Sequence, residues 1–441
     1  MTTLRAHPAG PIRGNTALPG DKSVSHRALM LAALAVGESR IEGLLEGTDV
    51  LATAGALRRL GVEIARDRGV WRVHGVGVGG LREPDQMLDL GNAGTGARLL
   101  LGILAGQPFT TFMTGDASLC SRPMARVSEP LSQMGATFVT RSGVRLPLAV
   151  SGSNALMPIT YAQPVASAQV KSAILLAGLH APGRTTVVEP QASRDHTERM
   201  LRHLGASVTS QATDSGQAVS IIGQPELVAS DLRVPGCISS AAFPLVAGAL
   251  GSGSSLRVEG VGCNPLRTGL LETLEAMGAK LRRGHVADVG GEPVTRLELQ
   301  QAPLSGVDVP ADRGPSMIDE YPILAVAAAS ATGTTRMHGL GELRVKESDR
   351  LAAMAEGLSA CGVAVEADED SLTVHGCGGP PPGGATIDAR HDHRIAMSFL
   401  VLGGAAKAAV TVRGAETIET SFPGFASLMN QLGARIERVE T

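Results

Sequence analysis

The fold is decided by a stretch near the N-terminus, Arg27–Ile41 (RALMLAALAVGESRI). Its first part, Arg27–Val36, is apolar nearly all round, which is typical of a helix that is buried on every side. Gly37 then makes a turn, and a short β-type run follows. A second helix pattern, Ala52–Leu60, alternates apolar with charged residues and stops at Gly61. The stretch therefore predicts an α/β module with a buried helix, a strand and a half-exposed helix.

This module recurs six times along the chain. In each module, the second helix ends in a hydrophobic residue followed by glycine. These closing glycines lie 74, 70, 73, 84 and 71 residues apart by subtraction. Self-similarity at such a period marks a repeat architecture. The six closing pairs are Leu60-Gly61, Met134-Gly135, Leu204-Gly205, Met277-Gly278, Cys361-Gly362 and Leu432-Gly433. Buried helices are expected at Arg27–Val36, Ala97–Ala105, Lys171–His180, Ala241–Leu250, Tyr321–Ala331 and Arg394–Ala405.

Two similar segments divide the repeats into two groups of three. They are Leu18–Ser23 (LPGDKS) and Val234–Ser239 (VPGCIS), and we interpret them as the two crossings between domains. The predicted domains are therefore residues 21–236, and residues 1–20 together with 237–441. A length of 441 residues is consistent with two domains.

Composition excludes several classes of protein. A net charge of -3 gives no broad attraction to nucleic acid or to an anionic membrane, and no run reaches about 18 apolar residues. Five cysteines without CxxC spacing argue against disulfides and zinc, and favour a reducing compartment. The stretch 75–80 matches GxGxxG, but no helix pattern follows it, and no P-loop is present. We expect no cofactor and no metal, and a cytoplasmic location.

Polar and basic residues gather where the buried helices begin. Helix N-termini carry free N–H groups and positive partial charge, so several together favour phosphate or carboxylate. Arginines grip such groups in bidentate fashion, and lysines act as point charges. The basic candidates are Lys22, Arg122, Arg194, Lys346, Arg350 and Arg394. A polar residue at a helix start is often only a cap, but charges beside apolar buried helices call for an anionic partner.

The densest segment is Arg344–Arg350 (RVKESDR). On a helix, Lys346 and Arg350 would share a face, and Glu347 would lie beside Arg350. Such a cluster is usually an ion-pair network. In a closed site, Glu347 and the preceding Asp319 are candidates for general acid and base.

Eight motifs in order along the chain resemble the EPSP synthase (3-phosphoshikimate 1-carboxyvinyltransferase) family of enolpyruvyl transferases. They are Gly20–Arg27 (GDKSVSHR), Gly91–Thr95 (GNAGT), Ser121–Met124 (SRPM), Ser167–Ser172 (SAQVKS), Arg194–His196 (RDH), Asp319–Pro322 (DEYP), Arg344–Arg350 and Asp392–Met397 (DHRIAM). The resemblance covers nearly the whole chain. It implies a two-domain inside-out α/β barrel of six βαβαββ-like units around buried inner helices.

The resemblance also implies a reaction and its ligands. The enolpyruvyl group of phosphoenolpyruvate would pass to the 5-hydroxyl of shikimate 3-phosphate, releasing phosphate, on the route to chorismate and aromatic amino acids. Shikimate 3-phosphate would contact Lys22, Ser23, Arg27, Ser167, Ala168, Gln169, Arg194, Asp319 and Lys346, mostly in the 21–236 domain. Phosphoenolpyruvate would contact Lys22, Gly94, Arg122, Gln169, Arg350 and Arg394, with the acid and base residues in the other domain.

Glu347 is our hypothesis for the acid that protonates the methylene carbon, and Asp319 for the base at the 5-hydroxyl. Lys22 would assist the phosphate that leaves the tetrahedral intermediate. Gly94 leaves room beside phosphoenolpyruvate, so we expect sensitivity to glyphosate. Some relatives carry a lysine before Thr-Phe-Pro, where this chain has Thr420-Ser421-Phe422-Pro423, so one cation is missing here.

Two alternatives stay open at this point. The sister transferase that acts on UDP-N-acetylglucosamine has a loop cysteine and a Lys-Asn pair, whereas this chain has Lys22-Ser23, and Cys120 precedes Arg122 by two residues. A noncatalytic phosphometabolite-binding relative would not need Lys22, Asp319 and Glu347. We expect a monomer whose partners are the two small substrates, with no nucleic acid or membrane partner.

Overall fold

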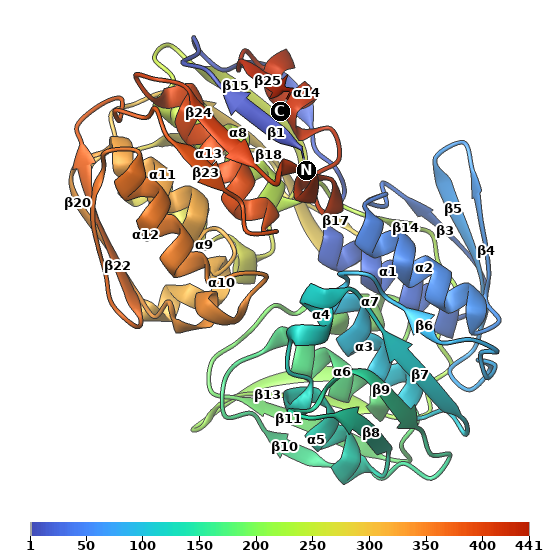
Figure 1. Cartoon of the computed structure of the whole chain (residues 1–441). Coiled ribbons are helices and arrows are strands. Elements are labelled where there is room, and N and C mark those ends of the chain that lie inside the picture. Colours follow the sequence, from blue (N-terminus) through green and yellow to red (C-terminus); the bar gives the residue numbers. More distant parts are fainter. Residues whose placement is uncertain (1, 441) are drawn as a thin grey trace. The chain divides into compact units, whose positions relative to one another are not determined.

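The computed structural model describes residues 2–440 and divides the chain into two compact units. The first unit comprises Gly20–Pro235 and the short segment Asp288–Glu292. The second unit comprises Met1–Pro19, Gly236–Ala287 and Pro293–Thr441. Figure 1 shows the helices and strands of the chain. Each unit has a hydrophobic core of its own. The segment Asp288–Glu292, which joins the first unit from within the second half of the chain, was not anticipated from the sequence.

Each unit is built around three helices that are buried on nearly all sides. In the first unit they are α1 (Lys22–Leu34), α3 (Gly94–Ala105) and α6 (Ala168–Gly178). In the second unit they are α8 (Ile238–Leu250), α11 (Tyr321–Ser330) and α13 (His393–Ala405). Four of the six begin three to five residues earlier than predicted, because polar or small residues such as Lys22 and Ser23 form the first turn. The predicted ligand residues Lys22, Gly94 and Ala168 therefore lie in the first turns of these helices.

The second helix of each module ends as predicted. These helices are α2 (Thr48–Arg59), α5 (Ala125–Met134), α7 (His196–His203), α9 (Gly269–Ala276), α12 (Arg350–Ala360) and α14 (Phe425–Gln431). The six closing glycines all have φ between 77° and 117°. This left-handed conformation is costly for residues with a Cβ atom, so glycine stops each helix and turns the chain into the next strand.

Within residues 2–440 the strands form six separate small sheets, three in each unit. Each sheet holds one parallel pair of strands, and the other neighbours along its strand order are antiparallel. In four sheets the two parallel strands lie on either side of a buried helix in the chain. In the other two sheets, Leu232–Arg233 pairs with the strand that follows α1, and Ser255–Gly262 pairs with the strand that precedes α1. The sheets of the first unit are β14 (Leu232–Arg233), β3 (Val36–Glu42), β5 (Val70–Val76) and β4 (Glu63–Asp67); β6 (Leu88–Asp89), β7 (Thr110–Thr114), β9 (Arg145–Ser151) and β8 (Thr137–Arg141); and β10 (Thr160–Ala162), β11 (Arg184–Glu189), β13 (Gly216–Ile222) and β12 (Val208–Thr213).

The N-terminal strands complete two sheets of the second unit. There, β1 (Thr3–Ala6) lies between β24 (Val410–Arg413) and β25 (Ile436–Val439), with β23 (Thr386–Asp388) at the edge. A second sheet holds β2 (Arg13–Ala17), β15 (Ser255–Gly262), β18 (Glu292–Gln300) and β16 (Lys280–Arg283), and β17 (Ala287–Val289) pairs with β18. The third is β19 (Asp308–Val309), β20 (Thr332–His338), β22 (Ser371–Cys377) and β21 (Ala364–Ala367).

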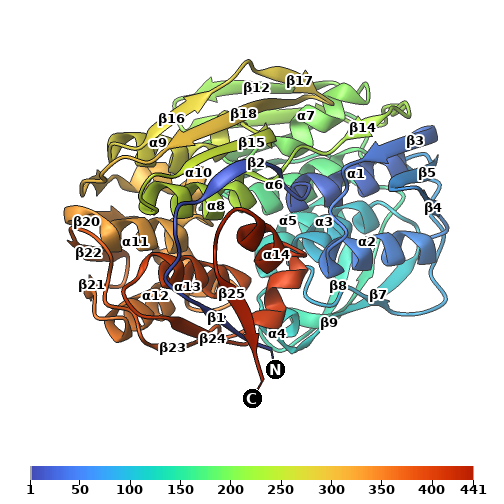
Figure 2. The same cartoon turned by 90° about the horizontal axis from the view of Figure 1, so that it is seen from above.

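The sheets lie outside the buried helices. Figure 2 shows α8, α11 and α13 of the second unit surrounded by the three sheets of that unit. Shorter helical turns lie at α4 (Ala117–Ser121), α10 (Gly314–Met317), η1 (Pro265–Arg267), η2 (Ala311–Arg313), η3 (Gly341–Val345) and η4 (Ala415–Thr420). The α/β class and the buried inner helices are confirmed, and none of the six sheets in residues 2–440 closes on itself.

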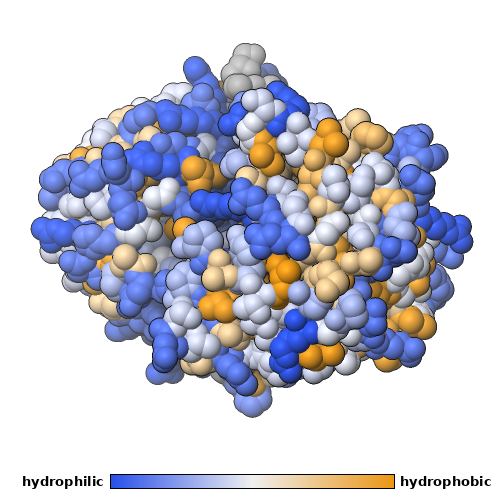
Figure 3. All heavy atoms as spheres, turned by 90° about the horizontal axis from the view of Figure 1, so that it is seen from below, coloured by the Kyte–Doolittle hydropathy of each residue, from blue (hydrophilic) through white to orange (hydrophobic). Residues whose placement is uncertain are grey.

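The surface is mixed in polarity. On the face drawn in Figure 3, hydrophobic residues lie in small groups among hydrophilic ones. Large apolar side chains that are exposed include Phe112, Val139 and Val345. None of the helices within residues 2–440 combines the length and the apolarity needed to cross a membrane.

Candidate active site

In the first unit, the start of α1 carries a cation and a capped helix terminus. The carboxylate of Asp21 accepts a hydrogen bond from the backbone N–H of Val24 at 3.0 Å, which fixes the first turn. Lys22 is the first residue of the helix, and its ammonium forms an ion pair with the nearly buried Asp49. About a quarter of the Lys22 side chain remains exposed (24%). The ammonium is therefore held in place and still accessible to a ligand.

Arg27, one turn further along α1, is buried and held by neutral oxygens. Its guanidinium donates to Thr197 Oγ1 at 2.7 Å, to Ser172 Oγ at 2.8 Å and to the carbonyl of Ser23 at 3.0 Å. Burial lowers the pKa of Arg27 to about 10, so the group stays charged at neutral pH. A buried cation whose hydrogen-bond partners are hydroxyls and a carbonyl is suited to bind an anion.

The start of α3 brings Gly94 against Arg122. Arg122 donates to Asn92 Oδ1 at 2.7 Å and to Ser118 Oγ at 2.9 Å, and both partners are again neutral. A Cβ atom added to Gly94 would lie 2.9 Å from Arg122 Nη1. Glycine thus lets the guanidinium of Arg122 approach the first turn of the helix, and a larger residue would displace it.

The start of α6 is tied to the start of α3. Ser167 caps the helix, Ala168 is its first residue, and Gln169 follows. The amide of Gln169 donates to Thr95 Oγ1 at 3.0 Å and accepts from Arg98 Nη1 at 2.8 Å. Two helix N-termini therefore lie side by side and combine their positive ends.

Arg194 lies in the loop between β11 and α7. It is close enough to Arg27 to contribute to the lowered pKa of that residue, so the two guanidinium groups lie near each other. Through these contacts, the first unit brings together the predicted residues of its inner helix starts and of the Arg194 loop. They are Lys22, Ser23, Arg27, Gly94, Arg122, Ser167, Ala168, Gln169 and Arg194.

In the second unit, Arg350 lies at the centre of a carboxylate cluster. Its side chain is 1% exposed and pairs with Glu347 at 2.5 Å, Asp392 at 2.8 Å and Asp319 at 3.1 Å. Burial opposes the charge of the guanidinium, but Asp392 first, then Glu347 and Asp319, raise the pKa of Arg350. The cluster fixes the two predicted acid and base residues on one cation.

Arg394 lies beside this cluster. Its guanidinium donates to the carbonyl of Asp319 at 2.9 Å and pairs with Glu320 at 3.3 Å. Asp392 caps α13 by accepting from the backbone N–H of Arg394 at 2.9 Å. The second unit therefore brings Asp319, Glu347, Arg350 and Arg394 together, with Lys346 next in the chain to Glu347.

A family model described as EPSP synthase (3-phosphoshikimate 1-carboxyvinyltransferase) matches residues 6–429. The chain belongs to the EPSP synthase family. It is 61% identical to the 3-phosphoshikimate 1-carboxyvinyltransferase of Paramagnetospirillum magneticum over 98% of both chains, and 58% identical to that of Rhodospirillum rubrum over 99% of this chain and 98% of the relative. Among solved structures, the EPSP synthase of Acinetobacter baumannii matches with a TM-score of 0.90 and 44% identity over 100% of both chains.

The enolpyruvyl transferase NikO of Streptomyces tendae shares the fold of this chain at low sequence identity. It has a TM-score of 0.80 at only 20% identity, with 100% of this chain and 99% of NikO covered. The family model and the two 3-phosphoshikimate 1-carboxyvinyltransferases confirm the sequence resemblance to the EPSP synthase family.

One local prediction for this family member is wrong. The segment around Lys346 is not helical: η3 ends at Val345, and α12 begins only at Arg350. The physical reason is Asp349, whose carboxylate accepts from the N–H of Ala352 at 3.0 Å and caps the new helix. The Glu347–Arg350 pair nevertheless forms, through a bend in place of a helix face.

Several residues of the site were missed by sequence reasoning. Asp392 is fully buried and is the strongest partner of Arg350, although the sequence suggested only a helix cap. Thr197 and Ser172 hold Arg27 from two other helices. The sequence signal that could have found such residues is a polar residue inside an otherwise apolar, buried helix, as at Ser172.

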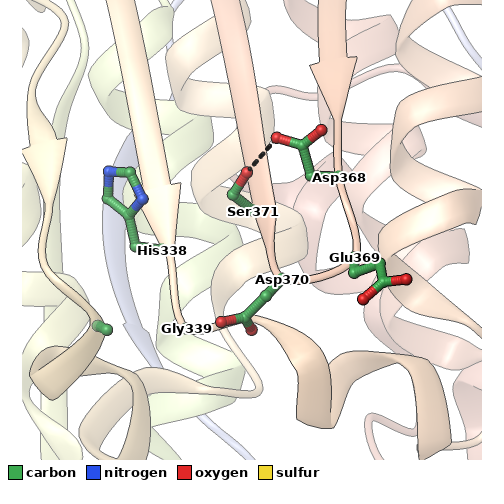
Figure 4. A pocket seen from close by; sticks show the side chains of 7 residues that line it. His338, Gly339, Asp368, Glu369, Asp370 and Ser371 are labelled. Carbon is green, nitrogen blue, oxygen red and sulfur yellow. Dashed lines mark hydrogen bonds between the residues drawn. The ribbon is translucent and has the colours of Figure 1, made fainter.

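An open hollow elsewhere in the second unit does not belong to the candidate site. It encloses about 430 Å³ and is lined by His338, Gly339, Asp368, Glu369, Asp370, Ser371 and Ala311 (Figure 4). Its carboxylates make it a poor place for phosphate. None of the predicted substrate-binding residues lines it.

Proposed function

We propose that this chain transfers the enolpyruvyl group of phosphoenolpyruvate to the 5-hydroxyl of shikimate 3-phosphate and releases phosphate. Membership of the EPSP synthase family, with relatives of that activity at up to 61% identity, supports this function. The observation that carries it is chemical. In the first unit the buried guanidinium of Arg27 is held by neutral oxygens, and in the second unit a carboxylate cluster surrounds an arginine of its own.

In this proposal the first unit holds shikimate 3-phosphate. Arg27 and Arg194 bind its phosphate, and their mutual repulsion is relieved when the anion binds. Ser23, Ser167, Gln169 and the backbone N–H of Ala168 supply neutral donors at the helix starts. From the second unit, Asp319 and Lys346 contact the same substrate.

Phosphoenolpyruvate binds Lys22, Arg122, Gln169 and the backbone at Gly94 through its phosphate and carboxylate. Arg350 and Arg394 complete its site. The carboxylate of phosphoenolpyruvate takes the place of Glu347 on Arg350, which frees Glu347 to reach the methylene carbon. The 23% exposure of the Glu347 side chain is consistent with such a move.

The reaction proceeds by addition and elimination. Glu347 donates a proton to the methylene carbon, and the adjacent carbon gains cationic character. The 5-hydroxyl attacks that carbon and gives its proton to Asp319, which forms a tetrahedral intermediate. The Glu347 carboxylate then takes a proton back from the methyl group while the carbon–oxygen bond to phosphate breaks. Lys22 stabilises the leaving phosphate, which carries away the proton that Asp319 took from the 5-hydroxyl.

The assay is phosphate release from purified protein with both substrates. Release that requires shikimate 3-phosphate and phosphoenolpyruvate together supports the proposal. Release with UDP-N-acetylglucosamine in place of shikimate 3-phosphate would identify the sister transferase, which the family match already disfavours. Binding of both substrates without release would identify a noncatalytic relative.

We further infer a monomer that works in a reducing compartment, the cytoplasm. All five cysteines are free thiols, which fits that compartment. Light scattering of the eluted protein tests the monomer, since a mass near twice 45.2 kDa would contradict it.

A further inference from the structure

A buried charge cluster lies next to the candidate site in the first unit. Lys171, on α6, is 1% exposed, and its ammonium lies 2.6 Å from Glu189 and 2.8 Å from Glu198. Both carboxylates are fully buried. Burial alone would lower the pKa of Lys171, but the two carboxylates raise it, so the residue is charged. Buried ions are costly to desolvate, so such a cluster is a poor means of gaining stability alone.

The cluster holds one backbone position from both sides. Glu189 Oε1 accepts the N–H of Ser193 at 2.9 Å, and the ammonium of Lys171 donates to the carbonyl of Ser193 at 3.1 Å. Ser193 is buried and lies in the loop between β11 and α7, which has no regular backbone hydrogen bonding. Such a loop depends on side chains for its backbone hydrogen bonds.

The residue after Ser193 is Arg194. We propose that Lys171 and Glu189 are positioning residues for Arg194, because by fixing the Ser193 backbone they set the point from which this guanidinium reaches the phosphate of shikimate 3-phosphate. The inference rests on the proposed function, in which Arg194 binds that substrate.

Electrostatics explain why the loop needs such an anchor. Arg194 lies near the buried, charged Arg27, and like charges repel each other. In the absence of substrate, this repulsion pushes the loop away from the position that binds phosphate. Two hydrogen bonds to charged groups, which are stronger than those between neutral groups, hold the backbone against it.

The test compares the same substitution at the two carboxylates. Glu189→Gln and Glu198→Gln each remove one negative charge from the cluster, which by itself favours anion binding. Glu189 uses Oε1 for Ser193 and Oε2 for Lys171, so a glutamine, with an NH2 group in place of one of these oxygens, loses one of the two contacts. Glu198 pairs with Lys171 and makes no bond to Ser193. We expect Glu189→Gln to raise the KM for shikimate 3-phosphate about tenfold and Glu198→Gln to leave it unchanged or lower.

A KM does not depend on the fraction of enzyme that is folded, so partial misfolding does not blur this comparison. Glu189→Asp keeps the charge and withdraws the carboxylate from Ser193, so it should raise the same KM. In Glu189→Gln and in Glu189→Asp, the KM for phosphoenolpyruvate at saturating shikimate 3-phosphate should stay near the wild-type value. Equal KM changes for both substrates, or equal effects of the two glutamine variants, would overturn the inference.

A double-mutant cycle shows whether the effect passes through Arg194. Arg194→Ala should weaken the binding of shikimate 3-phosphate. Adding Glu189→Gln to Arg194→Ala should weaken that binding no further. An undiminished effect of Glu189→Gln in the Arg194→Ala background would overturn the positioning role while leaving the proposed function intact. If Arg194→Ala alone has no effect, the assigned role of Arg194 fails, and the inference fails with it.

Discussion

His26 provides a direct test of how burial controls charge beside the candidate site. Its ring is fully buried between α1 and α2, with Nδ1 2.8 Å from Thr53 Oγ1. Among residues 2–440, no hydrogen-bond partner lies by Nε2. Burial, followed by the nearby charges of Lys22 and Arg27, lowers the pKa of His26 from 6.5 to about 3. The imidazole therefore stays neutral in the folded chain through the mildly acidic range.

The consequence for stability has a definite sign. Since the folded pKa lies below the unfolded one, the unfolded chain binds the proton first as the pH falls, and the free energy of unfolding decreases below pH 6.5. With a pKa of 6.5 unfolded and about 3 folded, lowering the pH from about 7 to about 5 reduces the free energy of unfolding by about 2 kcal/mol through this group alone.

Urea unfolding at the two pH values, for the wild type and for His26→Asn, measures the contribution of His26 to the pH dependence of the free energy of unfolding. Asparagine places a polar atom where Nδ1 lies and can keep the bond to Thr53, but it does not titrate. The variant should lose about 2 kcal/mol less than the wild type on acidification. The exposed His203, replaced by asparagine, is the control and should leave the wild-type loss in place. An equal loss in the wild type and in His26→Asn would refute the reasoning.

The remaining predictions concern catalysis and two glycines. Glu347→Gln should still bind both substrates but turn over at least about 100-fold more slowly. As a control, Glu356→Gln, which removes an exposed ion pair with Arg390, should not change turnover. Wild-type turnover in Glu347→Gln would exclude Glu347 as the acid. In Gly94→Ala, the new Cβ lies 2.9 Å from Arg122 Nη1, so the KM for phosphoenolpyruvate should rise about tenfold. Millimolar glyphosate should compete with phosphoenolpyruvate in the wild type and inhibit this variant less; no competition in the wild type would contradict that. Gly55→Ala, inside α2 with open space around it, should raise stability by about 0.5–1 kcal/mol in urea unfolding without changing either KM.

The sequence predicted the repeat because its signals are local. An all-round apolar run is buried whatever it packs against, and a glycine after a hydrophobic residue ends a helix through its own backbone freedom. This is why all six closing glycines, such as Gly61 and Gly433, have positive φ in the structure. Helix starts were predicted too late where the first turn is polar, as at Lys22, because apolar periodicity carries no signal there.

The segment around Lys346 shows the limit of local patterns. Charges at helical spacing predicted a helix through residues 346–350, but Asp349 offers its carboxylate to the N–H groups of a helix that begins at Arg350. Capping and continuing a helix are competing uses of the same residues.

For the candidate site, the sequence alone determined which residue types stand at the helix starts. From these it predicted an anion site and a resemblance to the EPSP synthase family. Only the tertiary structure decided their partners. Asp392 on Arg350, Ser172 and Thr197 on Arg27, and the Lys171 cluster on the Arg194 loop all join segments that are distant in the sequence or lie on different helices. Whether a charge is neutralised, buried or left for a ligand depends on these partners, because electrostatic energy depends on distance and surroundings that no local pattern specifies.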